Sequence, residues 1–200
     1  MKFNPEKYKD FYFEVATRIL NTPSPSGYYK EVMEVVKEYA TAFGAEFELT
    51  RKGCGIITVK GKDSSKTLGL SAHCDTLGAM VRGIGGKGEP SFTKIGGPSL
   101  PTLDGEYCTV LTRDGKRYSG TFLSKSPSVH VYADSATKPR DDANMYVRLD
   151  EVVKTADDVR KLGIESGDYI CIDPKTTVTE SGFLKSRFID DKASVACFIT

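Results

Sequence analysis

The chain has 200 residues, of which 39% are hydrophobic and 28% charged, a composition typical of a soluble globular protein. Its 28 basic and 27 acidic residues nearly cancel, which argues against nucleic acid or an anionic membrane as the main partner. No apolar run approaches the roughly 20 residues that span a bilayer, and the N-terminus lacks the apolar core of a signal peptide. We therefore expect a cytoplasmic protein, and its five scattered cysteines, never in a CxxC pair, indicate neither a disulfide framework nor a thiolate zinc site.

Two amphipathic helices are predicted at the start of the chain. The first places apolar side chains at helical spacing: Tyr8, Phe11, Tyr12, Val15 and Ile19. The second would take Ser26 as its N-cap and end at Gly44. Its apolar face consists of Tyr29, Val32, Met33, Val36, Ala40 and Phe43.

Three strand-like segments follow these helices: "EFELT", "GIITVKG" and "TLGLSAH". The last is an almost continuous apolar run, which is typical of a strand buried on both faces of an α/β sheet. We therefore expect the first part of the chain to belong to an α/β domain.

The middle of the chain has a different pattern. Residues 82–105 are rich in Gly and Pro, and Asp114-Gly115 predicts a hairpin with a two-residue type I′ turn. A short helix is predicted with Thr155 as cap, Asp158 at the capping-box position and Gly163 as its stop, before the strand "DYICID". These features predict a small β-rich domain inserted into the α/β domain, and we divide the chain into residues 1–79, 80–178 and 179–200.

The last segment, "FIDDKASVACFIT", reads as an apolar strand end followed by a helix that opens with Asp190 and Asp191. Acidic residues favour a helix N-terminus electrostatically. Because this helix has no cap and the outer domain has few elements, we expect the chain to be the N-terminal part of a longer protein.

A histidine and an aspartate two positions apart, His73 and Asp75, form the first candidate site. On an extended chain these side chains point the same way and Cys74 points the other. A metal-bound imidazole usually donates its second N–H to a carboxylate, and this spacing could supply both groups. Taken alone, the pattern favours a structural histidine.

The second candidate is Asp190-Asp191, since a carboxylate at a helix start can bridge two cations about 3.5–4 Å apart, as two-metal hydrolases require. In isolation this pair favours helix capping. The glycines of "GIGGKG" lack the following helix of a dinucleotide fingerprint, and Cys74 lacks a basic partner for nucleophilic or redox chemistry. His130, the other histidine, is more typical of a structural or interface residue.

Five segments taken in order resemble the M42 metallo-aminopeptidases, relatives of glutamyl aminopeptidase and the tetrahedral TET peptidases. "SAHCDTLGAMV" resembles the AHxDxxG metal motif of that family, and "RFIDDKASVACF" resembles its D-[DN]-[RK] segment. The other three are "TPSPSGYYKEV", "FTKIGGPSLPTLDGEYCTV" and "VRKLGIESGDYICID".

The resemblance implies an α/β fold: a phosphorylase/hydrolase-like α/β catalytic domain, truncated at residue 200, with an inserted β-rich, barrel-like dimerisation domain. It implies that His73 ligates one metal, that Asp75 is the catalytic carboxylate beside it, and that Asp190 bridges two divalent metal ions, Zn²⁺ or Co²⁺. Asp191 receives no metal role. The family's Glu-Glu pair, a further acidic ligand and a second histidine would lie downstream, outside this sequence.

The function that follows is a dinuclear, metal-dependent aminopeptidase that removes N-terminal residues from peptides. We expect homo-oligomers built from dimers, often of twelve subunits in this family, and no nucleic acid or membrane partner. Because a catalytic zinc keeps at least three protein ligands, residues 1–200 alone should bind metal poorly and be inactive. The alternatives are an M20-type metallo-carboxypeptidase or deacylase, and a non-catalytic oligomeric scaffold with a degenerate site.

Overall fold

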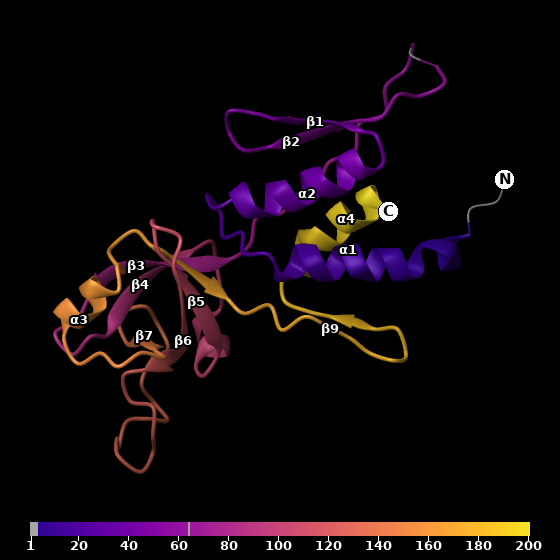
Figure 1. Cartoon of the computed structure of the whole chain (residues 1–200). Coiled ribbons are helices and arrows are strands. Elements are labelled where there is room, and N and C mark those ends of the chain that lie inside the picture. The colour runs from indigo at the N-terminus through magenta and orange to yellow at the C-terminus, as the bar shows by residue number, and fades with distance from the viewer. Residues whose placement is uncertain (1–3, 64) are drawn as a thin grey trace. The chain divides into compact units, whose positions relative to one another are not determined.

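A computed structural model describes residues 4–63 and 65–200 and divides the chain into two compact units, each considered by itself (Figure 1). Unit 1 comprises Met1–Thr76 together with Pro174–Thr200, and unit 2 comprises Leu77–Asp173. The chain thus leaves unit 1, forms unit 2 and returns to unit 1.

Helices form the centre of unit 1. A 3-10 turn, η1 (Pro5–Tyr8), leads into α1 (Lys9–Asn21), and α2 (Lys30–Ala42) and α4 (Ile189–Ile199) pack against it. Figure 1 shows α4 between the other two helices, although it comes from the far end of the chain. Their shared core is apolar and almost free of solvent: Val15, Ala16, Ile19, Leu20, Val32, Val36, Tyr39, Cys74, Val195 and Ala196. Both predicted N-terminal helices are therefore confirmed.

The predicted cap of α2 is wrong. The helix begins at Lys30, and its N-cap, Tyr29, makes no side-chain capping bond to any residue described. Ser26 lies several residues before the helix and uses its hydroxyl elsewhere, on Asp75. The end of the helix agrees with the prediction, since Gly44 follows it with a φ of +76°.

Two of the three predicted strands form a hairpin in unit 1. Strands β1 (Glu46–Leu49) and β2 (Gly55–Thr58) pair antiparallel, with Phe47 opposite Ile57, and contact α2. A Cβ atom at Gly55 would lie 2.9 Å from the Phe47 ring, so a larger residue there would have to displace that side chain. A smaller pair, β9 (Thr177–Val178) and β10 (Leu184–Lys185), follows unit 2.

The third predicted strand, "TLGLSAH", is not formed. Leu68 and Leu70 are 84% and 65% exposed, and within the described residues this segment has no strand beside it. A buried strand needs a neighbour on its hydrogen-bonding edge and cover on its faces, and an apolar run specifies neither. Burial begins only from Cys74, and a single parallel bridge joins Pro25 to Thr76.

Unit 2 contains one six-stranded sheet in the order β4-β3-β8-β5-β6-β7, in which all neighbouring strands are antiparallel. The strands are β3 (Gly78–Ile84), β4 (Pro90–Ile95), β5 (Tyr107–Leu111), β6 (Arg117–Ser124), β7 (Met145–Leu149) and β8 (Tyr169–Ile172). The outermost strands β4 and β7 contact each other, so the sheet is nearly closed into a barrel. Its interior holds Phe92 and Phe122, both fully buried, with ring centroids 5.1 Å apart in an edge-to-face arrangement.

The hairpin predicted at Asp114-Gly115 joins β5 to β6, but its turn differs from the prediction. Across the described loop 112–116 only Gly115 has a positive φ, of 86°, whereas a type I′ turn requires positive φ at both central residues. The Gly115 amide donates to the Thr112 carbonyl at 3.0 Å, and Thr112 donates to Lys116. The loop is therefore a longer turn that closes on a glycine.

The helix predicted in unit 2 is confirmed as α3 (Ala156–Lys161). Thr155 caps it, and Asp158 completes the capping box by accepting from the Thr155 amide at 3.0 Å. Gly163 follows with a φ of +91°. A second 3-10 turn, η2 (Leu100–Leu103), precedes β5.

The fold as a whole mixes helices and strands, with the helices largely in unit 1 and a barrel-like sheet in unit 2. Among the described residues, no helix is both long and apolar enough to cross a membrane.

Candidate metal centre

Two segments of unit 1 that are far apart in the sequence meet at the candidate site. The first is the extended segment His73–Thr76, which runs beside the loop Thr22–Ser26 after α1. The second is the start of α4, where Asp190 and Asp191 have non-helical φ and ψ and the peptide bond between them is cis. The site therefore depends on the packing of α4 against α1, which the apolar core of unit 1 provides.

The His73 imidazole lies between two carboxylates. Its Nδ1 is 3.2 Å from Asp75 Oδ1, and its Nε2 is 3.3 Å from Asp190 Oδ1. All three side chains are at the surface, with exposed fractions of 52%, 55% and 94% for His73, Asp75 and Asp190. The structure thus brings together all three residues singled out in the sequence.

The ring geometry gives the two carboxylates different tasks. With its proton on Nδ1, the imidazole donates to the Asp75 backbone carbonyl at 3.3 Å, with Asp75 Oδ1 beside it at 3.2 Å, and the lone pair on Nε2 then faces Asp190. A backbone carbonyl or a carboxylate on the second ring nitrogen fixes the tautomer of a metal-binding histidine and raises its basicity.

Cys74 is separate from this cluster, as its position between His73 and Asp75 suggests. The side chain is 8% exposed and belongs to the apolar core beneath the site. Burial raises the pKa of the Cys74 thiol to about 11, and Asp75 and Asp191 add to the effect against the opposing charge of Lys192. The thiol is therefore protonated at neutral pH and lies in the apolar core, apart from the His73 cluster.

The donor set fits a divalent transition metal in kind but not in number. An imidazole nitrogen and a carboxylate oxygen are ordinary ligands of Zn²⁺, and a catalytic zinc keeps three protein ligands. Within residues 4–63 and 65–200 no group of three or more His, Cys, Asp or Glu side chains is arranged to hold a metal ion. His73 and Asp190 are thus a partial site that needs at least one further donor.

The sequence interpretation missed two residues beside this cluster. The Ser26 hydroxyl donates to Asp75 Oδ2 at 2.5 Å, and the buried Lys192 ammonium donates to the Thr22 carbonyl at 2.7 Å. Ser26 has the features of a helix cap, which concealed its contact with Asp75. The signal for Lys192 is a lysine directly after two aspartates, where a charge on the buried face of a helix would need partners.

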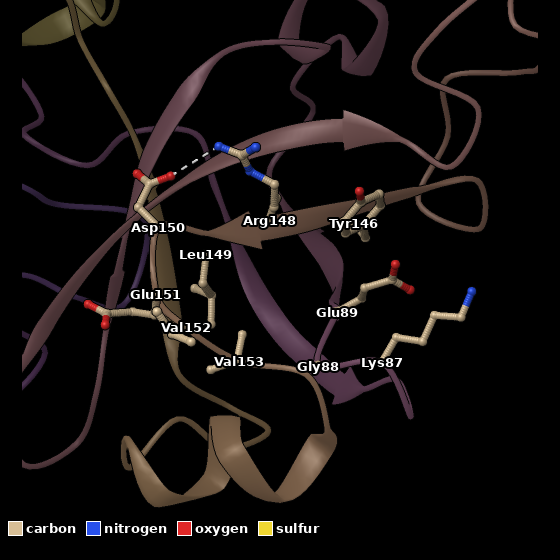
Figure 2. A pocket seen from close by; sticks show the side chains of 10 residues that line it. All are labelled: Lys87, Gly88, Glu89, Tyr146, Arg148, Leu149, Asp150, Glu151, Val152 and Val153. Carbon is tan, nitrogen blue, oxygen red and sulfur yellow. Dashed lines mark hydrogen bonds and ion pairs between the residues drawn. The ribbon is translucent and has the colours of Figure 1, made fainter. Parts of the chain in front are cut away.

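Unit 2 has a hollow of its own, with a volume of about 480 Å³ (Figure 2). Its walls come from the β3–β4 turn, β7 and the residues after β7, and they carry both cations (Lys87 and Arg148) and anions (Glu89, Asp150 and Glu151). Arg148 already pairs with Asp150 at 3.4 Å. Because the charges are mixed and do not converge on one point, the hollow indicates no particular ligand.

The comparisons with known proteins agree with one another. A family model described as M42 glutamyl aminopeptidase matches residues 53–200. The Bacillus subtilis (strain 168) protein named "Putative aminopeptidase YhfE" is 41% identical over 186 residues, which are 93% of this chain and 54% of that protein.

Solved structures show the same fold. Aminopeptidase APDkam598 from the archaeon Desulfurococcus kamchatkensis has a TM-score of 0.84 at 24% identity, covering 96% of this chain and 51% of that one. The TET1 peptidase of Pyrococcus horikoshii, described as assembling into a tetrahedron or a large octahedral shell, has a TM-score of 0.75 at 22% identity, covering 94% and 54%. The chain therefore spans about half the length of these relatives.

Proposed function

The chain belongs to the M42 glutamyl aminopeptidase family, and from that membership we propose that the protein is a dinuclear metal-dependent aminopeptidase, which removes N-terminal residues from peptides. The observation that carries the proposal is the position of His73 between Asp75 and Asp190. Two segments distant in the sequence deliver an imidazole nitrogen and a carboxylate oxygen to one point on the surface.

Each side chain has a defined task in this proposal. His73 would hold a metal through Nε2, Asp75 would orient the imidazole from the Nδ1 side, and the Asp190 carboxylate would serve as a further ligand shared between two metals. A pair of divalent cations supplies the chemistry of acidifying water and polarising a peptide carbonyl. The exposure of all three side chains leaves that chemistry open to a peptide.

The remaining ligands would come from sequence corresponding to the other half of the relatives. By resemblance to the family these are an adjacent glutamate pair, a further acidic residue and a second histidine. The same sequence would complete a phosphorylase/hydrolase-like catalytic domain around unit 1 and lie beside the exposed apolar segment at Leu68 and Leu70.

Unit 2 would mediate dimerisation in larger homo-oligomers of a cytoplasmic protein. The description of TET1 as forming a tetrahedron or an octahedral shell supports this part of the proposal, as does its matching fold. Light scattering of the protein with and without residues 77–173 replaced by a short linker would test it, since the shortened form should lose its dimer contacts.

The activity is tested with the protein expressed from its complete reading frame. The substrates are aminoacyl p-nitroanilides with free amino groups and their N-acetylated counterparts, with the metal removed by a chelator and then restored as Zn²⁺ or Co²⁺. The proposal predicts hydrolysis only of the free-amine substrates, loss of activity with the chelator and recovery with metal.

Other outcomes would identify the alternatives. Cleavage of N-acylated substrates, or of the C-terminal residue of a peptide, would indicate an M20-type deacylase or carboxypeptidase. A protein that assembles but hydrolyses none of these substrates in the presence of either metal would be an oligomeric scaffold with a degenerate site.

A further inference from the structure

The loop Thr22–Ser26, which follows α1, contacts both segments of the candidate metal centre. One end of the loop accepts a hydrogen bond from α4, the helix that carries Asp190, and the other end donates to Asp75. A loop placed in this way can fix the two segments relative to each other.

Hydrogen bonds hold the loop against the His73–Thr76 segment. The Ser24 hydroxyl, on a side chain that is 3% exposed, donates to the Cys74 carbonyl at 2.7 Å. The Thr76 amide donates to the Ser24 carbonyl at 2.8 Å, and the Ser26 amide donates to the Thr76 carbonyl at 3.2 Å. This short parallel pairing sets the register in which Ser26 lies beside Asp75.

The other end of the loop is fixed by a buried charge. Lys192 is 1% exposed, and its Nζ donates to the Thr22 carbonyl at 2.7 Å. A buried ammonium group is costly unless it is hydrogen-bonded, so this contact holds the start of α4 to the loop. Asp190 lies two residues before Lys192 on the same helix start.

The two oxygens of Asp75 have separate partners. Oδ2 accepts from the Ser26 hydroxyl at 2.5 Å, and Oδ1 lies 3.2 Å from His73 Nδ1. A hydroxyl bound to a carboxylate forms a charge-assisted hydrogen bond, and it restricts the broad terminal torsion of the aspartate. Without Ser26, the half-exposed carboxylate of Asp75 would be free to rotate away from the imidazole.

We propose that Ser26 is a positioning residue of the metal centre, which holds Asp75 so that His73 presents Nε2 beside Asp190. The inference rests on the proposed function for the identity of the bound group, but it concerns metal binding and not the substrate. Ser26 would act through Asp75 and would touch neither the metal nor the peptide.

The test compares Ser26→Ala, Ser26→Thr and a control, Ser181→Ala, in the protein expressed from its complete reading frame. Ser181 is a suitable control because it is also an exposed serine of unit 1, hydrogen-bonded to Thr179 at 3.0 Å in the β9–β10 turn. Co²⁺ alone is the probe, titrated against a competing chelator while the visible absorption of the bound ion is recorded. Peptidase activity and thermal unfolding are measured in parallel.

We expect Ser26→Ala to weaken Co²⁺ binding about 10-fold and to change the shape of the absorption spectrum. Ser26→Thr should restore both, because it keeps the hydroxyl, and Ser181→Ala should match the wild type. The melting temperature of the metal-free protein should not change, since Ser26 is exposed and caps no helix.

Equal Co²⁺ affinity and an identical spectrum in Ser26→Ala and wild type would overturn the positioning role and leave the aminopeptidase proposal in place. Conversely, a wild type that binds Co²⁺ but cleaves no aminoacyl anilide would refute only the proposed function. A wild type that binds no Co²⁺ would overturn both. If Ser26→Ala bound Co²⁺ more weakly and its metal-free form also unfolded at a lower temperature than the metal-free wild type, Ser26 would be merely structural.

Discussion

Unit 2 is built around one nearly closed sheet, whereas unit 1 is built around three α-helices and two short hairpins. In unit 2 the six strands form a nearly closed sheet around the buried rings of Phe92 and Phe122. In unit 1 the helices share a dry core, yet Leu68 and Leu70 are exposed beside the segment that carries His73. The candidate site lies in unit 1 and not in the nearly closed sheet of unit 2.

The two units therefore differ in what their polar side chains do. In unit 2, polar side chains such as Thr155 and Asp158 stabilise the fold, because they form the capping box at the start of α3. In unit 1, the polar side chains of His73, Asp75 and Asp190 come from segments distant in the sequence and lie close together. Substitutions matched between the two units can therefore separate structural from functional roles.

The largest effect should come from the histidines, of which each unit has one. His73→Ala removes the imidazole that faces Asp75 and Asp190, and we expect metal affinity and aminopeptidase activity to fall at least about 100-fold. His130→Ala in unit 2 is the matched control, because its side chain is exposed, and it should leave both unchanged. Metal analysis after dialysis, together with anilide hydrolysis, would check this, and a similar loss in both variants would remove the distinction between the units.

The second effect concerns the core of unit 2. Phe122→Ala deletes a fully buried ring packed on Phe92 and should cost about 3–5 kcal/mol. Tyr107→Ala, on a side chain that is 62% exposed, is the control and should cost much less. Hydrogen-exchange mass spectrometry should show lost protection in peptides of unit 2 only, and an equal loss in the α1, α2 and α4 peptides would mean that the units do not unfold separately.

A third, smaller effect distinguishes two residues that both have the sequence features of helix caps. Thr155→Ala removes a real capping box and should destabilise unit 2 by about 1 kcal/mol. Ser26→Ala should leave the unfolding free energy of unit 1 nearly unchanged, although it alters metal binding. Urea denaturation of each variant would measure this, and equal destabilisation would mean that Ser26 supports the fold.

The smallest effect is a pH dependence in unit 2. Burial raises the pKa of Asp168, whose Oδ1 has no hydrogen-bond partner among the described residues and lies 4.0 Å from Arg113. The folded state therefore binds this proton more tightly than the unfolded state, so stability should fall as pH rises from the unfolded pKa, near 3.9, through the folded one.

Asp168→Asn keeps the acceptor for the Glu165 amide, which donates to Oδ2 at 2.8 Å, and cannot ionise. The variant should lose less stability than the wild type between pH 4 and pH 7 in urea denaturation. If the two pH profiles were parallel, the Arg113 guanidinium would already compensate for the burial.

The sequence was most informative where the structure depends on near neighbours. The capping box at Thr155, the two N-terminal helices and the hairpin at Gly115 all follow from residues close together in the chain. The segment "TLGLSAH" was predicted wrongly because its composition reports a preference for burial but does not identify a pairing strand. The turn type at Asp114-Gly115 was wrong because one positive φ sufficed there.

The candidate site also combines local patterns, which the sequence shows, with a distant contact, which it does not. His73-x-Asp75 and Asp190-Asp191 were each ambiguous, since both patterns have ordinary structural interpretations. Their proximity depends on the packing of α4 against α1, which no short motif encodes. Ser26 was assigned to the nearest helix, because a local rule accounts for it equally well before the contact with Asp75 is known.

The most direct measurement is anomalous X-ray diffraction from crystals of the protein expressed from its complete reading frame and grown with Zn²⁺, with data collected on both sides of the zinc edge. The account predicts two peaks about 3.5–4 Å apart, one of them about 2.0–2.1 Å from His73 Nε2, with Asp190 between them. Asp75 should remain on Nδ1 of the same ring, with the Ser26 hydroxyl on its other oxygen. Zinc peaks that avoid both His73 and Asp190 would contradict the account.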